Sequence, residues 1–188
     1  MSLIEKIVLE KYIMERIDLI NGYKINLIGI DKHEIIEKLC EKCSDYYILH
    51  DGILPSKENI AEIFNTLPPN KNYEDKFILG IYKFDNELVG IIDVVRDFPT
   101  AGVWMLGLML IEPKERGKGL GKIVHEALDK WAINLGAKSF RIGVIEENKK
   151  GINFWSDLGY TKIKQVTIDF TEKTHIVNVM TLQCCNKL

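Results

Sequence analysis

The residues best suited to chemistry lie in one glycine-rich segment, Glu115 to Lys122, which reads ERGKGLGK. Glycine lets the backbone turn so that successive N–H groups point at one spot. The helix expected directly after this segment would add partial positive charge at its N-terminus. Arg116, Lys118 and Lys122 would add full charges. The segment therefore predicts a phosphate site. The alternative is a glycine-rich turn with solvated basic side chains.

Two common phosphate-binding patterns do not fit this segment. A Walker A loop requires Ser or Thr after its Lys, whereas Ile123 follows Lys122. A Rossmann fingerprint requires G-x-G-x-x-G, and Lys122 stands where the last glycine should follow Gly117 and Gly119. The pattern therefore disfavours both a Walker-type nucleotide site and a dinucleotide site.

One acidic residue, Asp93, interrupts an otherwise apolar strand pattern in IIDVV. An unpaired carboxylate inside a sheet is costly, and odd polar residues in clefts often belong to functional sites. Asp93 is therefore the candidate catalytic base or substrate contact. The alternative is an ion pair with an arginine, or exposure at a sheet edge. Asp97, near the end of the same strand, is the reserve candidate.

A second group of candidates precedes these strands. Asp45, Tyr46 and Tyr47 place an acid beside aromatic rings, a combination that suits a cationic amine. The alternative is ordinary surface and core residues. Cys40 and Cys43 form a C-x-x-C pattern on the apolar side of a predicted helix, without the second pair that a zinc site needs. We expect buried thiols and no metal, and we expect the four histidines to be structural or exposed.

The elements that must position these residues follow from the apolar pattern. Asn21-Gly22, between two apolar stretches, predicts a hairpin. Asp31 with Glu34 predicts a capping box at a helix start, and a second helix begins near Ser56. Further runs predict strands at 77–84, 88–95, 103–111 and 139–145, helices at 120–135 and 148–158, and two strands after residue 160. These elements predict one α/β domain with a mixed sheet over residues 1–188, in which residues 1–14 could be an extension.

Composition narrows the classes of partner. The net charge of -2 offers no global excess of positive charge for a nucleic acid backbone. No apolar run approaches the roughly 20 residues that span a bilayer, and the first residues lack the apolar stretch of a signal peptide. We therefore expect a cytoplasmic protein with neither a nucleic acid nor a membrane partner.

A resemblance to a known family covers roughly residues 88–160. Arg116, Gly119 and Gly121 match R/Q-x-x-G-x-G/A, and IEPKERGKGLGK resembles V-x-P-x-x-R-G-x-G-I-G of the GNAT superfamily of N-acetyltransferases. Downstream, VIEEN and FWSDLGY resemble that family's next strand and helix. The resemblance implies a mixed, mostly antiparallel sheet flanked by helices, with splayed central strands that hold acetyl-CoA.

The resemblance also implies roles for particular residues. The pyrophosphate of acetyl-CoA would be bound by backbone N–H groups of Arg116, Gly117, Lys118, Gly119, Leu120, Gly121 and Lys122. Main-chain groups of Met109 and Ile111 would contact the pantetheine arm. Asn148 would contact the cofactor, cap a helix, or both.

By the same resemblance, the reaction is direct attack of an amine of an unidentified small molecule or peptide on the thioester. The chain departs from the family where Trp155 replaces the Tyr that often protonates the leaving thiolate, so we expect Trp155 to pack rather than react. The alternatives are a non-catalytic acyl-CoA-binding sensor and, third, a dinucleotide-dependent enzyme. A homodimer is implied by resemblance only.

Overall fold

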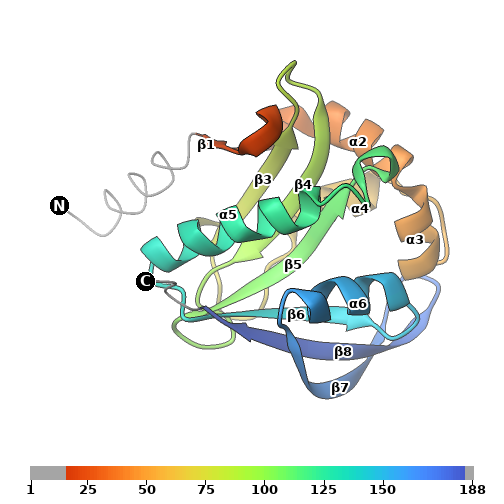
Figure 1. The fold of residues 1–188 in the computed structure, drawn as a ribbon. Helices are drawn as coiled ribbons and strands as arrows, with labels where there is room; N and C mark the ends of the chain where they lie inside the picture. Colours follow the sequence, from red (N-terminus) through yellow and green to blue (C-terminus); the bar gives the residue numbers. More distant parts are fainter. Residues whose placement is uncertain (1–15, 185–188) are drawn as a thin grey trace.

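A computed structural model describes residues 16–184, and within that range eight strands form one mixed sheet in the order β1-β2-β3-β4-β5-β6-β8-β7 (Figure 1). The strands are β1 (Ile17–Asp18), β2 (Lys24–Leu27), β3 (Lys76–Tyr82), β4 (Leu88–Val95), β5 (Val103–Ile111), β6 (Ser139–Ile145), β7 (Thr161–Asp169) and β8 (Thr174–Gln183). Neighbouring strands are antiparallel except β5 and β6, which are parallel. The predicted mixed, mostly antiparallel sheet is confirmed. Residues 1–14, the expected extension, lie outside the described residues.

Helices cover both faces of the sheet. They are α2 (His33–Lys42), α3 (Ser44–His50), α4 (Lys57–Asn65), α5 (Leu120–Asn134) and α6 (Lys149–Asp157), with 3-10 turns η1 (Ile20–Gly22), η2 (Ile30–Lys32), η3 (Tyr73–Asp75) and η4 (Pro113–Glu115). In Figure 1, α5 and α6 lie in front of the sheet, and α2 and α4 lie behind it. The sheet therefore has a distinct face for each pair of helices.

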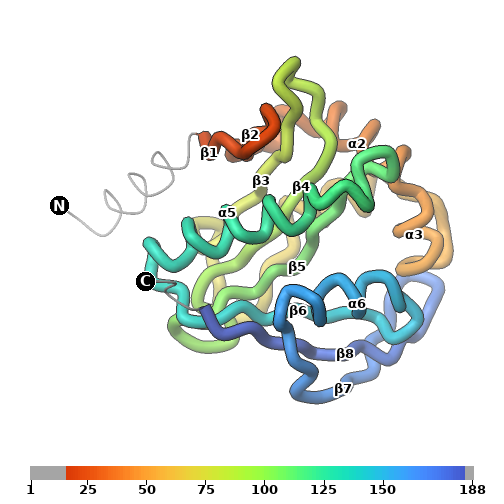
Figure 2. Tube along the Cα trace, viewed as in Figure 1, coloured from red at the N-terminus to blue at the C-terminus, as the bar shows by residue number. Residues whose placement is uncertain are grey.

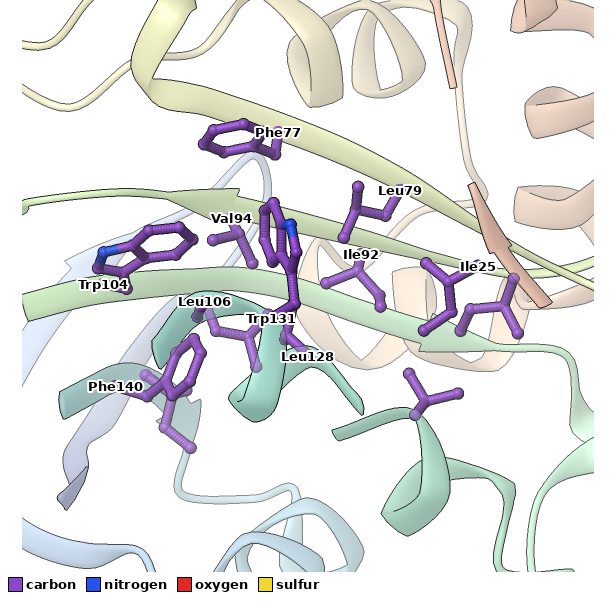
Figure 3. Packing of buried hydrophobic residues seen from close by; sticks show 14 of the residues in the cluster. Ile25, Phe77, Leu79, Ile92, Val94, Trp104, Leu106, Leu128, Trp131 and Phe140 are labelled. Atoms are coloured by element: carbon purple, nitrogen blue, oxygen red, sulfur yellow. The ribbon is translucent and has the colours of Figure 1, made fainter. Parts of the chain in front are cut away.

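Each face has its own apolar core. On the α5 face, Trp131 of α5 meets Phe77 and Trp104 edge-on, with ring centroids 5.1 and 5.3 Å apart (Figure 3). On the other face, Cys40 and Cys43 are buried with the apolar side chains of α2 and α4. Burial raises the pKa of the Cys43 thiol to about 11, so it stays protonated near neutral pH. The expectation of buried thiols is confirmed for this pair.

The local predictions near the N-terminus had mixed outcomes. The Asn21-Gly22 hairpin is confirmed, because β1 and β2 pair antiparallel and Asn21 has a φ of 65°. The capping box at Asp31 is wrong. Asp31 lies inside the η2 turn, which precedes the helix, and α2 begins after Lys32 without a side-chain cap. The helix α3, which follows α2 after the single residue Cys43, was not predicted from the sequence.

The centre of the sheet is split. β5 pairs with β4 from Met105 to Ile111, but it pairs with β6 only from Val103 to Met105. Beyond Met105 the two strands diverge, as Figure 1 shows. We call the opening between 106–111 of β5 and 142–145 of β6 the wedge. The expected splay of central strands is therefore present.

A bulge explains where the divergence begins. Asp93 of β4 lies opposite Leu108, but its neighbour Val94 lies opposite Leu106, so Gly107 is an extra residue in β5. An extra residue bends its strand and increases the local twist. The bulge therefore turns the second half of β5 away from β6.

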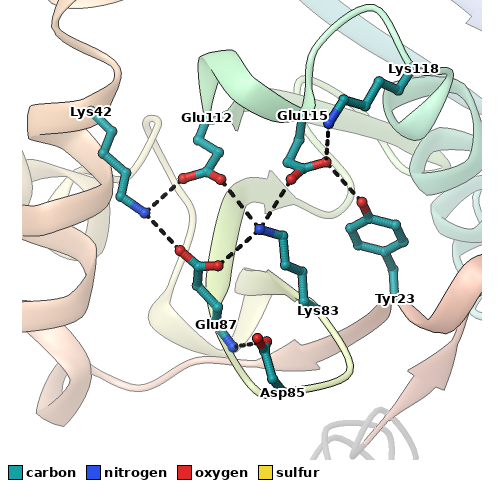
Figure 4. A network of polar contacts seen from close by, with 8 residues as sticks. All are labelled: Tyr23, Lys42, Lys83, Asp85, Glu87, Glu112, Glu115 and Lys118. Atoms are coloured by element: carbon teal, nitrogen blue, oxygen red, sulfur yellow. Dashed lines mark hydrogen bonds and ion pairs between the residues drawn. The ribbon is translucent and has the colours of Figure 1, made fainter.

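An ionic network holds the glycine-rich segment to the rest of the fold (Figure 4). The ammonium of Lys83 lies 2.9 Å from Glu87, 3.1 Å from Glu115 and 3.8 Å from Glu112. Lys42 of α2 lies 2.7 Å from Glu112 and 3.0 Å from Glu87. Because Glu112 and Glu115 are buried at the η4 turn, this network fixes the residues just before the glycines to α2 and to the β3–β4 hairpin.

Glu115 also connects this turn to the residue just before β2. The hydroxyl of Tyr23 donates a hydrogen bond of 2.8 Å to Glu115 Oε2. This hydrogen bond, followed by that from Lys83, lowers the pKa of Glu115 to about 2 from its ordinary 4.5. The ionised carboxylate therefore stabilises the folded protein above about pH 4.5, and this contribution is lost as the pH falls towards 2.

We predict that Tyr23→Phe lowers the free energy of unfolding at pH 7 by about 1 kcal/mol, because Glu115 loses one hydrogen-bond donor. The pKa of Glu115 then moves back towards 4.5, so the difference from wild type should shrink as the pH approaches 2. Urea unfolding at a series of pH values checks this result. The control is Tyr73→Phe at an exposed tyrosine, which should follow the wild-type pH dependence. A constant difference at all pH values would contradict the role given to Glu115.

Candidate functional site

The glycine-rich segment forms an open turn at the N-terminus of α5. Gly117 and Gly119 have φ values of 75° and 83°, in the left-handed region that favours glycine. A Cβ atom at either position would meet nothing within 4 Å, so the backbone conformation rather than space requires glycine there. Gly119 precedes α5 without a side-chain cap, which leaves the first N–H groups of the helix for another acceptor. This geometry suits an anion.

Gly121 has a different role, in the packing of the site. A Cβ atom there would lie 3.0 Å from Phe154 of α6 and 3.5 Å from Met109 of β5. The absent side chain therefore lets the start of α5 approach both α6 and β5. The structure thus brings Met109, the glycine turn and α6 together beside the wedge.

Arg116 makes side-chain contacts that are not evident from the sequence. Its guanidinium donates hydrogen bonds to both carboxylate oxygens of Asp45 on α3, one of them at 3.1 Å, and its Nε donates to the carbonyl of Ile111 at 2.6 Å. The thiol of Cys43 contacts the same carbonyl at 3.6 Å. The Arg116 charge is thus directed at α3, and the Ile111 carbonyl is already occupied. The hydrogen bond from Arg116 lowers the pKa of Asp45.

The two lysines of the segment differ in their surroundings. Lys118 is exposed but lies 3.3 Å from Glu115, which draws its ammonium towards the ionic network. Lys122, in the first turn of α5, is exposed and forms no ion pair with any other residue in the range 16–184. Lys122 is therefore the cation best placed to add charge to the anion site.

Asn148 and Trp155 have structural roles on α6. Asn148 caps the helix, since its side-chain oxygen accepts a 2.9 Å hydrogen bond from the N–H of Gly151. The capping role is confirmed, and a contact with the cofactor stays a prediction. Trp155 packs edge-on against Tyr160 and His125, with ring centroids 5.2 and 5.9 Å apart, as expected of a packing residue.

His125 has a partner that its sequence context did not reveal. Its Nε2 lies 2.9 Å from the hydroxyl of Tyr160, and both side chains are buried. Burial lowers the pKa of His125 and raises that of Tyr160. The two groups therefore form a neutral, structural pair beneath Trp155.

Asp93 lies at the bulge, on the sheet face that α2 and α4 cover. Its Oδ2 accepts a 2.7 Å hydrogen bond from the ammonium of Lys76, a lysine rather than the arginine considered above. Lys76 also donates to the carbonyl of Thr66 at 2.9 Å. Oδ1 of Asp93 is buried without a hydrogen-bond partner among the described residues. Burial raises the pKa of Asp93, although Lys76 opposes this effect.

The reserve candidate, Asp97, stabilises a turn. Its φ is 54°, and its Oδ1 accepts a 2.6 Å hydrogen bond from the N–H of Gly102. The carboxylate is therefore engaged with the loop between β4 and β5.

Among the three predicted acceptor contacts on α3, Asp45 pairs with Arg116 as described. Tyr47 is buried and donates a 3.1 Å hydrogen bond to Cys40 Sγ, so it belongs to the core. Tyr46 is half-buried and stacks on His50, with centroids 5.2 Å apart. The three adjacent residues therefore have different roles: Asp45 forms an ion pair, Tyr47 belongs to the core, and Tyr46 stacks on His50.

The turn between β7 and β8 fastens this end of α3 across the sheet (Figure 2). Lys173 donates to the carbonyl of Ile48 at 2.8 Å, and the ring of Phe170 lies 4.1 Å from that of His50. The ring nitrogens of His175 lie 3.0 Å from the carbonyl of His50 and 3.2 Å from Glu147. These contacts join α3 to the strands on the far side of the wedge.

Other features of the described residues lie apart from the wedge. A shallow hollow of about 280 Å³ lies between α6 and β7–β8, on the flank of α6 away from Gly121, and Lys149, Asn178 and Met180 are among its lining residues. Between residues 16 and 184, no group of three His, Cys, Asp or Glu side chains could hold a metal ion. No helix in the same range is long and apolar enough to cross a membrane.

Similar solved structures share this fold. An acetyltransferase from Thermus thermophilus aligns with a TM-score of 0.67 at 20% identity, over 88% of this chain and 99% of that chain. A spermidine N-acetyltransferase from Vibrio cholerae, in complex with CoA and spermine, aligns with a TM-score of 0.66 at 13% identity, over 87% and 96%. At these identities the likeness concerns the fold.

Two curated proteins are similar in sequence over part of their length. The "Uncharacterized N-acetyltransferase YobR" of Bacillus subtilis (strain 168) is 25% identical over 122 residues, which are 64% of this chain and 46% of that protein. The thialysine N-epsilon-acetyltransferase of Mus musculus is 35% identical over 49 residues, 26% of this chain and 29% of that protein. This chain thus matches less than half the length of each.

A match to a family model defines the family. The family model described as "Acetyltransferase (GNAT) family" matches residues 38–160, which run from α2 through the wedge, the glycine turn and α6 to Tyr160. This match contains the elements described around the wedge except β7, β8 and the turn between them. The chain belongs to the acetyltransferase (GNAT) family.

Proposed function

We propose that the protein is an N-acetyltransferase that transfers the acetyl group of acetyl-CoA to an amine. The observation that carries the proposal is the wedge, with the glycine turn at one end. Beyond Met105 no strand among residues 16–184 pairs with the edge of β5 that faces β6, and this edge can bond an extended amide-containing arm as a further strand would. The N-terminus of α5 lies beside it for a pyrophosphate.

The arrangement suits a thioester cofactor in shape as well as in charge. Because Gly121 has no side chain, α5 lies close to α6, and Met109 of β5 contacts the start of α5 beside the wedge. Backbone N–H groups from Gly117 to Lys122 would bind the pyrophosphate, and main-chain groups near Met109 would bind the pantetheine arm. Because the Ile111 carbonyl is engaged by Arg116, we assign the arm to the backbone before it. Two proteins named above are named for amines, spermidine and thialysine.

Asp93 is the proposed base. The attacking amine has an ordinary pKa of about 10.4 and must lose its proton before it can attack the thioester carbonyl. The carboxylate of Asp93 would take that proton directly or through a water molecule, the new N–C bond forms, and the C–S bond breaks to release CoA as thiolate. Trp155 cannot supply a useful proton to that thiolate, so protonation from solvent is assigned here.

We predict that Lys122→Glu weakens acetyl-CoA binding by about tenfold, or about 1.4 kcal/mol, because it replaces a cation with an anion at the phosphate site. Isothermal calorimetry measures the binding. Lys130→Glu is the matched control, because Lys130 is exposed on the same helix but lies nearer its other end. Equal weakening by both variants would show only an effect of net charge. The absence of binding by folded wild-type protein would refute the cofactor assignment.

We predict that Asp93→Asn lowers kcat/KM at pH 7 by about 100-fold, measured as thiol release with an amine that the wild type accepts. Since burial raises the pKa of Asp93 above 3.8, wild-type activity should fall as the pH drops through that raised value. The variant should lack this fall. Asp97→Asn makes the same chemical change at the nearby turn, at a position whose positive φ Asn tolerates, and should retain activity.

The outcomes also separate this proposal from a sensor. Unchanged turnover in Asp93→Asn would remove that residue from the mechanism but leave the transferase assignment standing. Micromolar acetyl-CoA binding without thiol release for any amine would instead favour a non-catalytic acyl-CoA-binding module.

A further inference from the structure

We propose that the acceptor carries a carboxylate as well as its amine, and that Arg141 of β6 binds this carboxylate. The inference rests on the proposed N-acetyltransferase function and names the class of acceptor. Amino acids, rather than simple alkyl amines, would then be the preferred substrates.

The sheet face opposite α5 has a glycine floor beside the wedge. Gly107 of β5 and Gly143 of β6 are both exposed, although their strands lie in the middle of an eight-stranded sheet. Without side chains, these positions leave the two diverging strands open to solvent on this face. An acceptor can therefore reach the wedge from the side opposite the α5 core.

Arg141 starts from the same face. It lies opposite Met105 in the β5–β6 pair, whereas the preceding pair, Trp104 and Phe140, is buried in the α5 core. Because successive side chains of a strand alternate, Arg141 points to the other face, two residues before Gly143. It is thus located where the strands begin to separate.

The Arg141 guanidinium has unused binding capacity. The residue is half-buried, and its side chain forms no ion pair or hydrogen bond with any of residues 16–184. Its neighbour on β8, Thr181, donates its hydroxyl hydrogen to the Phe140 carbonyl. A guanidinium presents donors in a planar fork that matches a carboxylate. The chemistry of an unpaired arginine at this place is therefore that of a carboxylate receptor.

Asp93 lies across the glycine floor from Arg141. On β4 it occupies the same face, with its Oδ1 buried and unpartnered among the described residues. Strand spacing and rise place the Asp93 and Arg141 backbones ~12 Å apart, and the two side chains shorten that gap. A small molecule with an amine at one end and a carboxylate at the other would place its amine at Oδ1 of Asp93, whose Oδ2 is paired with Lys76, and its carboxylate at Arg141. A simple alkyl amine would engage only Asp93.

The test compares each amino acid with the amine formed by removing its carboxylate: L-lysine with cadaverine, and L-ornithine with putrescine. Thiol release from acetyl-CoA gives kcat/KM for each. We expect wild type to prefer the amino acid in at least one pair by about 30-fold, the effect of a charged hydrogen-bonded pair. Arg141→Gln should bring that ratio near one by lowering turnover of the amino acid, and should leave turnover of the amine within about threefold. The retained turnover of the amine shows that the variant is folded.

Two further variants sharpen the result. Arg141→Lys keeps the charge but not the fork, and should restore part of the preference. Lys164→Gln removes an exposed cation from the same face, on β7 opposite Val179, and should change kcat/KM for neither the amino acid nor the amine. Equal turnover of both members of every pair by wild type would overturn the carboxylate assignment and leave the transferase function standing. So would an equal loss for both members in Arg141→Gln. The absence of thiol release with every amine would overturn both.

Discussion

The extra residue in β5 is the constraint on which the rest of this structure depends. Gly107 interrupts the register with β4 at Asp93, and β5 then leaves β6 after pairing only from Val103 to Met105. Without that divergence, the middle of the sheet would be a closed surface, and its backbone groups would bond one another. The bulge thus creates the wedge, exposes its glycine floor and places the carboxylate of Asp93 beside it.

The elements around the wedge are held by polar contacts as much as by the cores. Glu112 and Glu115 tie the glycine turn to Lys83 and Lys42, while Arg116 ties it to Asp45 on α3. Glu112 and Glu115 are buried, and a buried charge must be paired to be tolerated. Two glycines are required for different reasons. Gly119 adopts a positive φ, and Gly121 lets the start of α5 pack closely against α6 and β5. The backbone of the anion site is therefore held in place by ion pairs on the residues that precede it.

Sequence patterns predicted the parts of this architecture that depend on local order. The apolar runs predicted each strand from β3 to β8, and the strand–turn–helix around Gly119 was recognisable from adjacent residues. Contacts between distant residues were not predictable in this way. The partners of Asp93 and His125 lie 17 and 35 positions away, and nothing in the sequence near either residue points to Lys76 or Tyr160.

Other local predictions were limited by competing chemistry. Asp31 has the right spacing to Glu34 for a capping box, but Asp31 lies within the η2 turn, and α2 begins only at His33. Arg116 matched a phosphate-loop pattern, yet its side chain found a carboxylate on α3. A pattern can therefore identify the backbone of such a loop while leaving the direction of its side chains undetermined.

The short pairing between β5 and β6 also affects how the molecule keeps its shape. Three residue pairs between β5 and β6 connect the two halves of the sheet, and beyond them no described residues of these two strands pair with each other. A molecule bound in the wedge could form hydrogen bonds to both β5 and β6 and so connect the two halves of the sheet. Ligand present at about 100 times its dissociation constant adds about 2.7 kcal/mol to the stability of a folded protein, a large part of the roughly 5–15 kcal/mol typical of domains. If acetyl-CoA is that ligand, the free energy of unfolding of this protein would rise with the concentration of acetyl-CoA.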